Sequence, residues 1–240
     1  MIIHKLLARF FRHKDDEVFY LMQAEAAIDW IGAQGIKIGE GISALDLGCG
    51  HGIFGRELMK RGCNVVFSDD ENFLAKDIVG QKFVRFNIDR DDMKIPGKYD
   101  LVICSNVFEH LAQPERFIRN AHELLKPQGV LYLSWTNWLS PWGGHEFSPL
   151  HYLGSRRGHL VYDKLTGRQR KHTPYVNLFP TYIGSALKLI SENNALQIKS
   201  LAPRYYTEFG FIMHIPLVRE FLAWNCAMLV ARKGGIKSSS

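Results

Sequence analysis

The chain has 240 residues, of which 46% are hydrophobic and 22% charged, a composition typical of an ordinary globular protein and not of a disordered one. No apolar run is long enough to span a membrane, because the longest candidate, residues 217–231, contains Arg219 and Glu220. The four cysteines form no CxxC pair, which excludes a zinc-finger pattern and indicates reduced thiols in a cytoplasmic protein. The net charge of +6 permits a nucleic acid, an anionic lipid surface or a phosphorylated substrate, and does not choose among them.

The chain begins with a basic amphipathic segment. Within residues 1–14 the apolar side chains share one face and basic side chains surround it, and a second helix is predicted at Glu17–Ala33. The 1–34 segment has three interpretations: a helical lid that packs its apolar face over the cofactor cleft, a peripheral attachment to an anionic membrane through residues 1–14, or a helix that binds a partner. We expect the lid.

A glycine-rich turn between a strand and a helix is the most informative feature of the sequence. A short apolar run from Ile42 ends in Asp46, and Gly48, Gly50 and Gly52 follow it. An amphipathic helix pattern over 53–61 begins directly after the last of these glycines. Glycines in such a turn let the backbone approach a ligand closely, and the helix N-terminus offers free N–H groups. The segment therefore predicts a cofactor-binding turn.

Two classes of cofactor compete for this turn. Residues 50–55 match the GxGxxG of dinucleotide-binding proteins, and Asp69 follows Gly50 by 19 positions. However, Asp46 lies just before the first glycine, where its carboxylate would repel a pyrophosphate but suits the cationic amino-acid end of S-adenosylmethionine. The pattern Asp-x-Gly-x-Gly-x-Gly resembles the glycine loop of class I S-adenosylmethionine-dependent methyltransferases, which is the interpretation that we prefer.

Later blocks extend this resemblance in the order that the family shows. Residues 64–69, 82–88 and 99–105 are typical of its second, third and fourth strands, and 124–133 of a helix end, a turn and the fifth strand. The resemblance implies that S-adenosylmethionine is the cofactor, that Asp69 or the adjacent Asp70 binds its ribose, and that Ser105 lies near its methionine portion. It also implies that Asn87 and Ile88 flank the adenine. The full set of expected cofactor-binding residues is Asp46, Gly48, Cys49, Gly50, Gly52, Asp69, Asp70, Asn87, Ile88 and Ser105.

Alternating short apolar runs and helical patterns predict an α/β fold, in which helices cover both faces of a parallel sheet. Further helices are expected at 72–79, 114–126 and 181–195, and further strands at 197–202 and 225–232. The resemblance implies a Rossmann-like, mostly parallel sheet of seven strands, the last of which is antiparallel. We expect a single domain with a helical lid (1–34), a cofactor-binding core (40–134), a cap inserted after the fifth strand (135–180), the C-terminal part of the sheet (181–233) and a polar tail (234–240).

The connection over 135–179 is too long for a plain loop, so we expect it to form a cap over the substrate. It contains Trp135, Trp138 and Trp142, followed by a basic run from Arg156 to Lys171. Aromatic rings beside cations suit a sugar phosphate or a lipid headgroup, although a run of charges is also typical of a solvated face. RNA would use similar contacts, but no nucleic-acid-binding module is recognisable. We therefore expect a small-molecule or glycan acceptor, which can be anionic, and no nucleic acid.

Methyl transfer to a hydroxyl needs a base, because a neutral alcohol is a poor nucleophile. The candidate catalytic residues are His110, after the fourth strand, and His145, in the cap. Both also have a structural interpretation: Glu109-His110 often only shapes this loop in the family, and His145 can simply bond to the backbone. Some family members carry Glu-x-x-Glu-His here and bind a divalent metal. Because Asn106 replaces the first glutamate, we assign no metal site, although the segment from His145 could complete one.

The sequence thus predicts an S-adenosylmethionine-dependent methyltransferase that acts on an oxygen atom of a small molecule or glycan. One alternative is a methyltransferase of a lipid-linked or quinone-like acceptor at the inner face of the membrane. The other is a methyltransferase-like binding module that has lost catalysis. The intact Asp46, the three glycines of the turn and Asp69 argue against loss of the cofactor.

Overall fold

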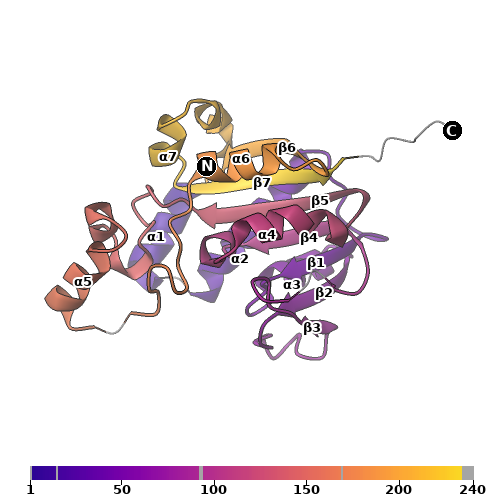
Figure 1. The fold of residues 1–240 in the computed structure, drawn as a ribbon. Helices are drawn as coiled ribbons and strands as arrows, with labels where there is room; N and C mark the ends of the chain where they lie inside the picture. The colour runs from indigo at the N-terminus through magenta and orange to yellow at the C-terminus, as the bar shows by residue number, and fades with distance from the viewer. Residues whose placement is uncertain (1, 15, 92–93, 169, 234–240) are drawn as a thin grey trace.

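The computed structural model describes residues 2–14, 16–91, 94–168 and 170–233, so the predicted tail at 234–240 lies outside the described residues. Seven strands form one sheet in the order β3-β2-β1-β4-β5-β7-β6 (Figure 1). The strands are β1 Ser43–Leu47, β2 Asn64–Asp69, β3 Phe83–Arg85, β4 Tyr99–Ser105, β5 Leu125–Thr136, β6 Leu196–Pro203 and β7 Asn225–Arg232. β7 is antiparallel to both neighbours and the other pairs are parallel. The predicted α/β fold with an antiparallel last strand is therefore confirmed.

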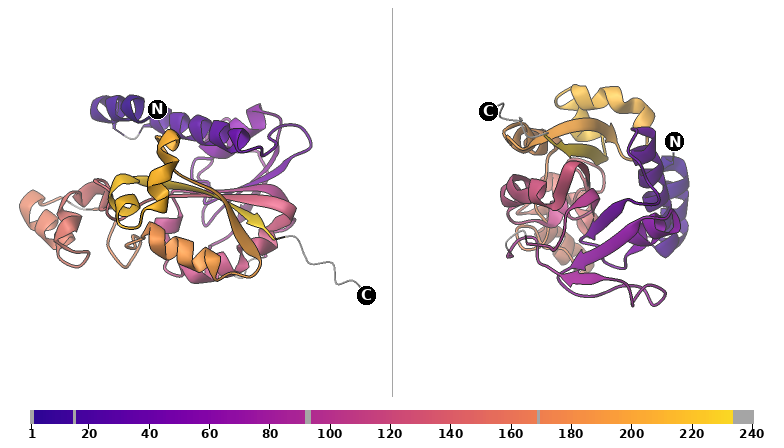
Figure 2. Two further views of the ribbon diagram at one scale, coloured as in Figure 1. Left: turned by 90° about the horizontal axis from the view of Figure 1, so that it is seen from above. Right: turned by 90° about the vertical axis from the view of Figure 1, so that its right-hand side faces the viewer.

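Helices cover both faces of the sheet, as expected (Figure 2). The α-helices are α1 Ile3–His13, α2 Glu17–Ala33, α3 Ile53–Lys60, α4 Pro114–Asn120, α5 Gly158–Thr166, α6 Ile183–Ser191 and α7 Val218–Leu222. The 3₁₀ turns are η1 Phe108–His110, η2 Ala121–Leu124, η3 His145–Phe147, η4 Leu150–Leu153 and η5 Thr207–His214. α2 and α3 pack on one face of the sheet, and α4 and α6 pack on the other.

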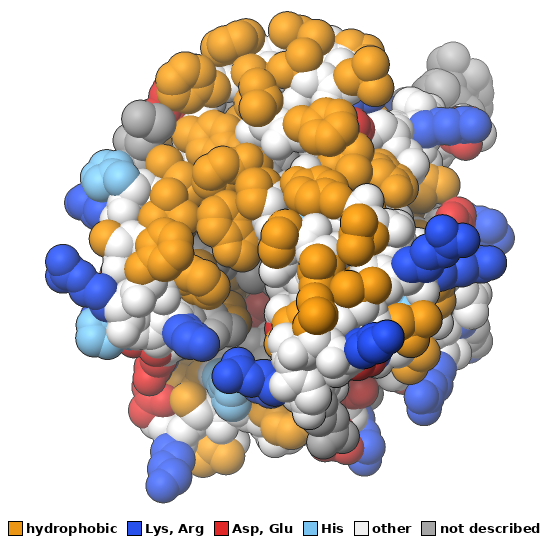
Figure 3. Space-filling model, turned by 90° about the vertical axis from the view of Figure 1, so that its left-hand side faces the viewer, with side chains coloured by type: hydrophobic (Ala, Val, Ile, Leu, Met, Phe, Trp, Pro, Cys, Tyr) orange, Lys and Arg blue, Asp and Glu red, His pale blue; other side chains and the backbone are white. Residues whose placement is uncertain are grey.

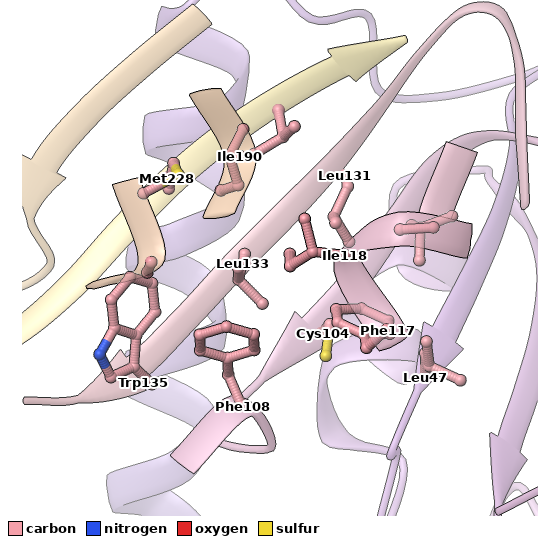
Figure 4. Close-up of a cluster of buried hydrophobic side chains, with 14 of the residues drawn as sticks. Leu47, Cys104, Phe108, Phe117, Ile118, Leu131, Leu133, Trp135, Ile190 and Met228 are labelled. Atoms are coloured by element: carbon pink, nitrogen blue, oxygen red, sulfur yellow. The ribbon is translucent and has the colours of Figure 1, made fainter. Parts of the chain in front are cut away.

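Alternating side chains of the central strands fill two hydrophobic cores. Along β4, Leu101 and Ile103 join the cluster beneath α2 and α3, whereas Val102 and Cys104 join the opposite one. Figure 4 shows the second cluster. Phe108 of η1 and Phe117 of α4 both belong to it and pack beside β4 and β5. Because the central strands are buried on both faces, they are held rigidly, and so are the loops that follow them.

The predicted helix at 72–79 is not formed. Leu74 and Ile78 have helical spacing and both pack on Phe67, which explains the pattern. The backbone, however, finds other partners: the Asn72 side chain accepts a hydrogen bond from the Leu74 N–H, and the Ala75 N–H donates to the His51 carbonyl. A side chain that bonds to a nearby N–H competes with helix formation, so the segment becomes a series of turns.

The predicted helix at 114–126 is shorter than expected. It ends at Asn120 and a 3₁₀ turn follows, because Leu125 already pairs with Tyr99 in the sheet. β5 then continues to Thr136, so Trp135 is fully buried in the sheet core and does not belong to the cap. β3 and α6 are also shorter than predicted, whereas α2, β2 and β7 have the predicted bounds.

The N-terminal segment packs its apolar face on the protein. Leu6 of α1 is buried, the Ile2 N–H donates to the Tyr205 carbonyl, and the Phe10 ring lies 6.4 Å from that of Trp142. This packing covers part of the apolar face of α1, whereas Phe11 is 79% exposed, and a lid over the cofactor cleft stays a prediction. None of the helices in the described part of the chain is both long and apolar enough to cross a membrane.

The inserted cap extends beyond the carboxyl ends of the parallel strands, where α5 lies farthest from the sheet (Figure 1). It contains η3, η4 and α5 and has a small core of its own, formed by Trp138, Phe147 and Leu178. The cap is therefore a folded unit at the end of the sheet where ligands bind in open α/β folds.

Candidate active site

The loop after β1 is held in the shape that a ligand-binding turn requires. Gly48, Gly50 and Gly52 all have positive φ, at 69°, 49° and 75°. The Gly48 N–H donates to the carbonyl of Ser68 at 2.8 Å, which fixes the loop to the end of β2. A Cβ atom added at Gly50 would meet no other described atom within 4 Å, so this part of the backbone faces open space. The loop therefore fits a ligand that lies directly against the main chain.

Two carboxylates border this loop. Asp46 is only 3% exposed and accepts a hydrogen bond from the Gly55 N–H at 2.7 Å, at the start of α3. Burial raises the pKa of Asp46 to about 7, and the nearby Asp69 adds to the increase. Asp69 is half-buried and accepts the N–H groups of Gly50 and Asp70, both at 2.8 Å; burial raises its pKa as well. The Asp70 side chain is exposed, so the geometry favours Asp69 as the preorganised carboxylate of the pair.

The other expected cofactor residues lie around the same edge of the sheet. Cys49 donates its N–H to Ser68, and burial raises the pKa of its thiol, which stays protonated. Ser105 ends β4 and accepts a hydrogen bond from Ser134. The Asn87 amide oxygen already caps the turn over 87–90 and Ile88 packs partly on the core, so their contacts with an adenine remain a prediction.

The loop after β4 carries Asn106, Glu109 and His110 in different directions. The Asn106 side chain contacts Gln23 and Arg204 instead of the histidine. Glu109 is buried, and its Oε1 atom accepts the Thr136 N–H at 3.0 Å. The ring of His110 points toward the cap, where its Nδ1 atom contacts the Asn177 carbonyl at 2.6 Å. The Asn-x-x-Glu-His pattern therefore does not converge on one point.

The structure does bring the two predicted catalytic histidines together. Their ring centroids lie 5.3 Å apart, and His172 completes a triangle at 5.3 Å from His110 and 4.5 Å from His145. Burial lowers the pKa of His145 to about 3, with a contribution from its two neighbours. His151 lies elsewhere, buried in the cap against the Ser140 carbonyl. We call His110, His145 and His172 the histidine cluster.

Sequence reasoning missed two residues of this region. His172 lies far along the chain from the other two histidines, directly after a run that was interpreted only as basic. Arg204 is 5% exposed and donates to Asn106 at 2.6 Å, while its Nε and Nη2 atoms have no hydrogen-bond partner among the described residues. Buried donors without a partner are costly, and these two would be satisfied by a ligand carboxylate near the end of β4. No local pattern in the sequence distinguishes Arg204 from a surface arginine.

Replacing Asp46 by Asn should change how stability depends on pH. The pKa of Asp46 is about 7 in the folded protein and 3.8 in the unfolded chain. The free energy of unfolding of the parent therefore decreases as the pH rises between these values, on the order of a few kcal/mol in total. Asn keeps the bond to Gly55 and carries no charge. Thermal unfolding of the cofactor-free protein should therefore show the Asp46→Asn variant gaining stability over the parent from pH 4.5 to pH 7.

Asp100 provides a matched control for this measurement. Burial acts to raise its pKa, but hydrogen bonds from Lys126 and Ser43 outweigh it, so the pKa of Asp100 is lowered. Asp100→Asn should therefore lose stability relative to the parent as the pH rises through the unfolded pKa. The same stability difference between Asp46→Asn and the parent at pH 4.5 and pH 8 would contradict the assignment.

Asp69→Ala should weaken the binding of S-adenosylmethionine about tenfold to a hundredfold, since a hydrogen bond to a charged group contributes roughly 1.5–3 kcal/mol. Isothermal titration calorimetry with the cofactor or its demethylated product measures this directly. Asp70→Ala, which removes an exposed neighbour, should bind as the parent does. A large loss in Asp70→Ala with none in Asp69→Ala would move the ribose contact to Asp70.

Comparison with solved structures shows the same fold in methyltransferases. Magnesium protoporphyrin IX methyltransferase from Synechocystis PCC 6803, solved with bound SAH, superposes with a TM-score of 0.56 over 92% of this chain and 87% of that chain, at 18% identity. An S-adenosylmethionine-dependent methyltransferase from Mesorhizobium loti gives a TM-score of 0.54 over 86% of this chain and 98% of that one, also at 18% identity. At these identities the likeness shows the fold alone.

Sequence comparison shows the family. An uncharacterized methyltransferase of Mycolicibacterium vanbaalenii is 29% identical over 197 residues, which cover 79% of this chain and 76% of that protein. One from Mycobacteroides abscessus is 28% identical over 210 residues, or 84% and 80% of the two chains. The family model described as a methyltransferase domain matches residues 11–171. The chain therefore belongs to the methyltransferase-domain family and is an S-adenosylmethionine-dependent methyltransferase.

Proposed function

We propose that the protein methylates a hydroxyl oxygen of a small molecule or glycan. The observation that supports this proposal is the histidine cluster, which joins the loop after β4 to the cap. Both the cluster and the glycine loop follow the carboxyl ends of parallel strands, so an acceptor beneath the cap would lie between them. A hydroxyl acceptor requires removal of its proton, and imidazole groups at this position provide for that.

The residues of the chain have separate tasks in this reaction. When bound, S-adenosylmethionine supplies a methyl group on a sulfonium, which a nucleophile displaces. Asp46, Asp69 and the glycine loop hold the cofactor, and the cap excludes water and orients the acceptor, which can account for much of the acceleration. His110 accepts the proton of the acceptor hydroxyl, and His145, which the lowered pKa of about 3 makes a weak base, positions that hydroxyl. Each task predicts a different kinetic effect of mutation.

The basic run of the cap is divided between two roles. Arg170 forms a two-bonded ion pair with Asp163 and also donates to the His172 carbonyl, so it supports the histidine cluster and is not free for substrate. Arg156 and Arg157 are exposed, and the first lies over the ring of Tyr175. An anionic part of the acceptor would therefore meet these two arginines.

His145→Asn should lower turnover by roughly a hundredfold, the effect typical of a misplaced acceptor, while cofactor affinity stays constant. Asn is chosen because His145 has a φ of 49°, which Asn tolerates well. Steady-state kinetics need the true acceptor, which transfer of label from radiolabelled cofactor into fractionated host extract would identify. His122→Ala is the control and should match the parent. His122 lies in η2, which precedes β5, whereas the cap follows the other end of that strand.

Label in a small molecule or glycan would support the proposal, whereas label in RNA or protein would contradict it. Binding of cofactor without transfer to any fraction would indicate a methyltransferase-like binding module. Parent-like turnover of His145→Asn with its true acceptor would show that His145 does not position the acceptor.

A lipid-linked acceptor is the second candidate, because one end of the molecule exposes an apolar surface. Figure 3 shows hydrophobic side chains gathered over this end, in the region of η5 and α7. Its exposed members are Phe209, Phe211, Ile215, Leu217, Phe221 and Leu222. Phe211 is 62% exposed and Leu217 76%, far more than a core residue, and a contiguous surface of this kind marks an interaction site. The net charge of +6 is compatible with an anionic bilayer as the partner of this surface.

Sedimentation with lipid vesicles tests this second candidate. The parent should bind vesicles that contain an anionic phospholipid more strongly than purely zwitterionic ones, and added salt should weaken the binding. Phe211→Glu combined with Phe221→Glu should abolish it, whereas Val79→Glu, an equally exposed apolar residue beyond β2, should not. Equal binding by the two variants, or none by the parent, would exclude a membrane-bound acceptor through this surface.

A further inference from the structure

The histidine cluster has a geometry that its possible role as a base does not require. His110 comes from η1 after β4, His145 from η3 in the cap and His172 from the segment after α5. Each offers one ring nitrogen, and these three atoms all lie within 4.8 Å of one another. A general base needs one imidazole near the acceptor, whereas here three segments converge on a single point.

The hydrogen bonds of two rings determine which ring nitrogen keeps a lone pair. Nδ1 of His110 contacts the Asn177 carbonyl oxygen, and Nδ1 of His172 contacts Oε2 of Glu146, both at 2.6 Å. A carbonyl or carboxylate oxygen only accepts, so each Nδ1 carries the proton and each Nε2 is left with a lone pair. Both rings are therefore fixed in the tautomer that binds metal ions through Nε2.

The third ring adds an unsatisfied atom at the same place. Nε2 of His145 is buried and has no hydrogen-bond partner among the described residues. The ring is held there by a backbone with a φ of 49°, which is uncommon for a residue other than glycine. A bound cation would satisfy this atom together with the Nε2 lone pairs of His110 and His172.

We propose that His110, His145 and His172 bind one divalent transition-metal ion of the Zn²⁺ type. Imidazole ligands suit zinc, copper, iron or nickel, and they do not suit magnesium or calcium, which prefer oxygen. Glu146 and Asn177 are the outer partners that orient the ligands. Glu146 is itself fixed, because its Oε1 atom accepts the N–H groups of Lys171 and His172 at 2.6 and 2.9 Å.

This ligand set differs from the Glu-x-x-Glu-His arrangement considered from the sequence. Asn106 is turned to Gln23 and Arg204, and Glu109 is bonded to the backbone of Thr136. Neither belongs to the three-residue group, and the third ligand comes instead from the far end of the cap.

The use of the ion in catalysis rests on the proposed function, although its binding does not. Three protein ligands leave a coordination position open, as in catalytic zinc sites. An acceptor hydroxyl at that position would have a lowered pKa and lose its proton more easily near neutral pH. The histidines would then act on the acceptor through the ion.

Titration of Co²⁺ into untagged protein that has been stripped with a chelator tests the site without cofactor or acceptor. The parent should bind one ion per chain with visible absorption bands, and Zn²⁺ should displace it. His145→Asn and His172→Ala should each weaken binding at least a hundredfold. Glu146→Gln, which alters an outer partner, should weaken it about tenfold to a hundredfold. The control is His122→Ala in η2, which should bind Co²⁺ with the affinity of the parent.

Thermal unfolding without ion shows whether each variant is folded, and addition of Zn²⁺ should raise the midpoint of the parent but not of His145→Asn. No stoichiometric ion in the parent, or parent-like affinity in both His145→Asn and His172→Ala, would overturn the site. An ion that is bound by the parent and lost in these variants, with no methyl transfer to any acceptor class, would support the site and overturn the proposed function.

Discussion

The parallel alignment of β1, β2, β4 and β5 is the constraint on which the site depends. Leu47 is paired with Ser68 and Ser105 with Ser134, so these strands deliver their following loops to one edge of the sheet. The hydrogen bond from Gly48 to Ser68 then couples the first loop to the second strand. A shift of register between β1 and β2 would separate the glycine loop from Asp69, which accepts the Gly50 N–H, and the ligand site would be lost.

Polar groups buried at this edge cost free energy that the two hydrophobic clusters offset. Asp46 is buried with one hydrogen bond, and Arg204 keeps two donors unpaired. Groups of this kind are tolerated where they prepare a site for a charged ligand. The free-energy cost of ordering them is met when the protein folds, so it does not weaken binding of the ligand.

How much could be predicted depended on whether the signal was local. The glycine turn, β2 and β7 were predictable because positive φ, strand composition and alternation act over a few residues. The prediction of a helix at 72–79 was wrong. Leu74 and Ile78 pack together without a helix, because Asn72 and His51 supply other hydrogen-bond partners for the backbone. His172 was missed for the opposite reason, since only the folded cap brings it beside His110. The cofactor contacts of Asn87 and Ile88 stay predictions.

The attachments of the cap decide how molecules can enter and leave. At one end the Trp138 N–H donates to Thr181, and at the other the Phe179 N–H donates to the carbonyl of Glu109. The first bond joins the two ends of the insertion to each other, and the second holds its far end to η1 after β4. Movement of the cap about these ends would separate His145 and His172 from His110, because His110 alone of the three belongs to η1. A molecule that entered beneath the cap by such a movement would meet the complete histidine cluster only after the cap had closed again.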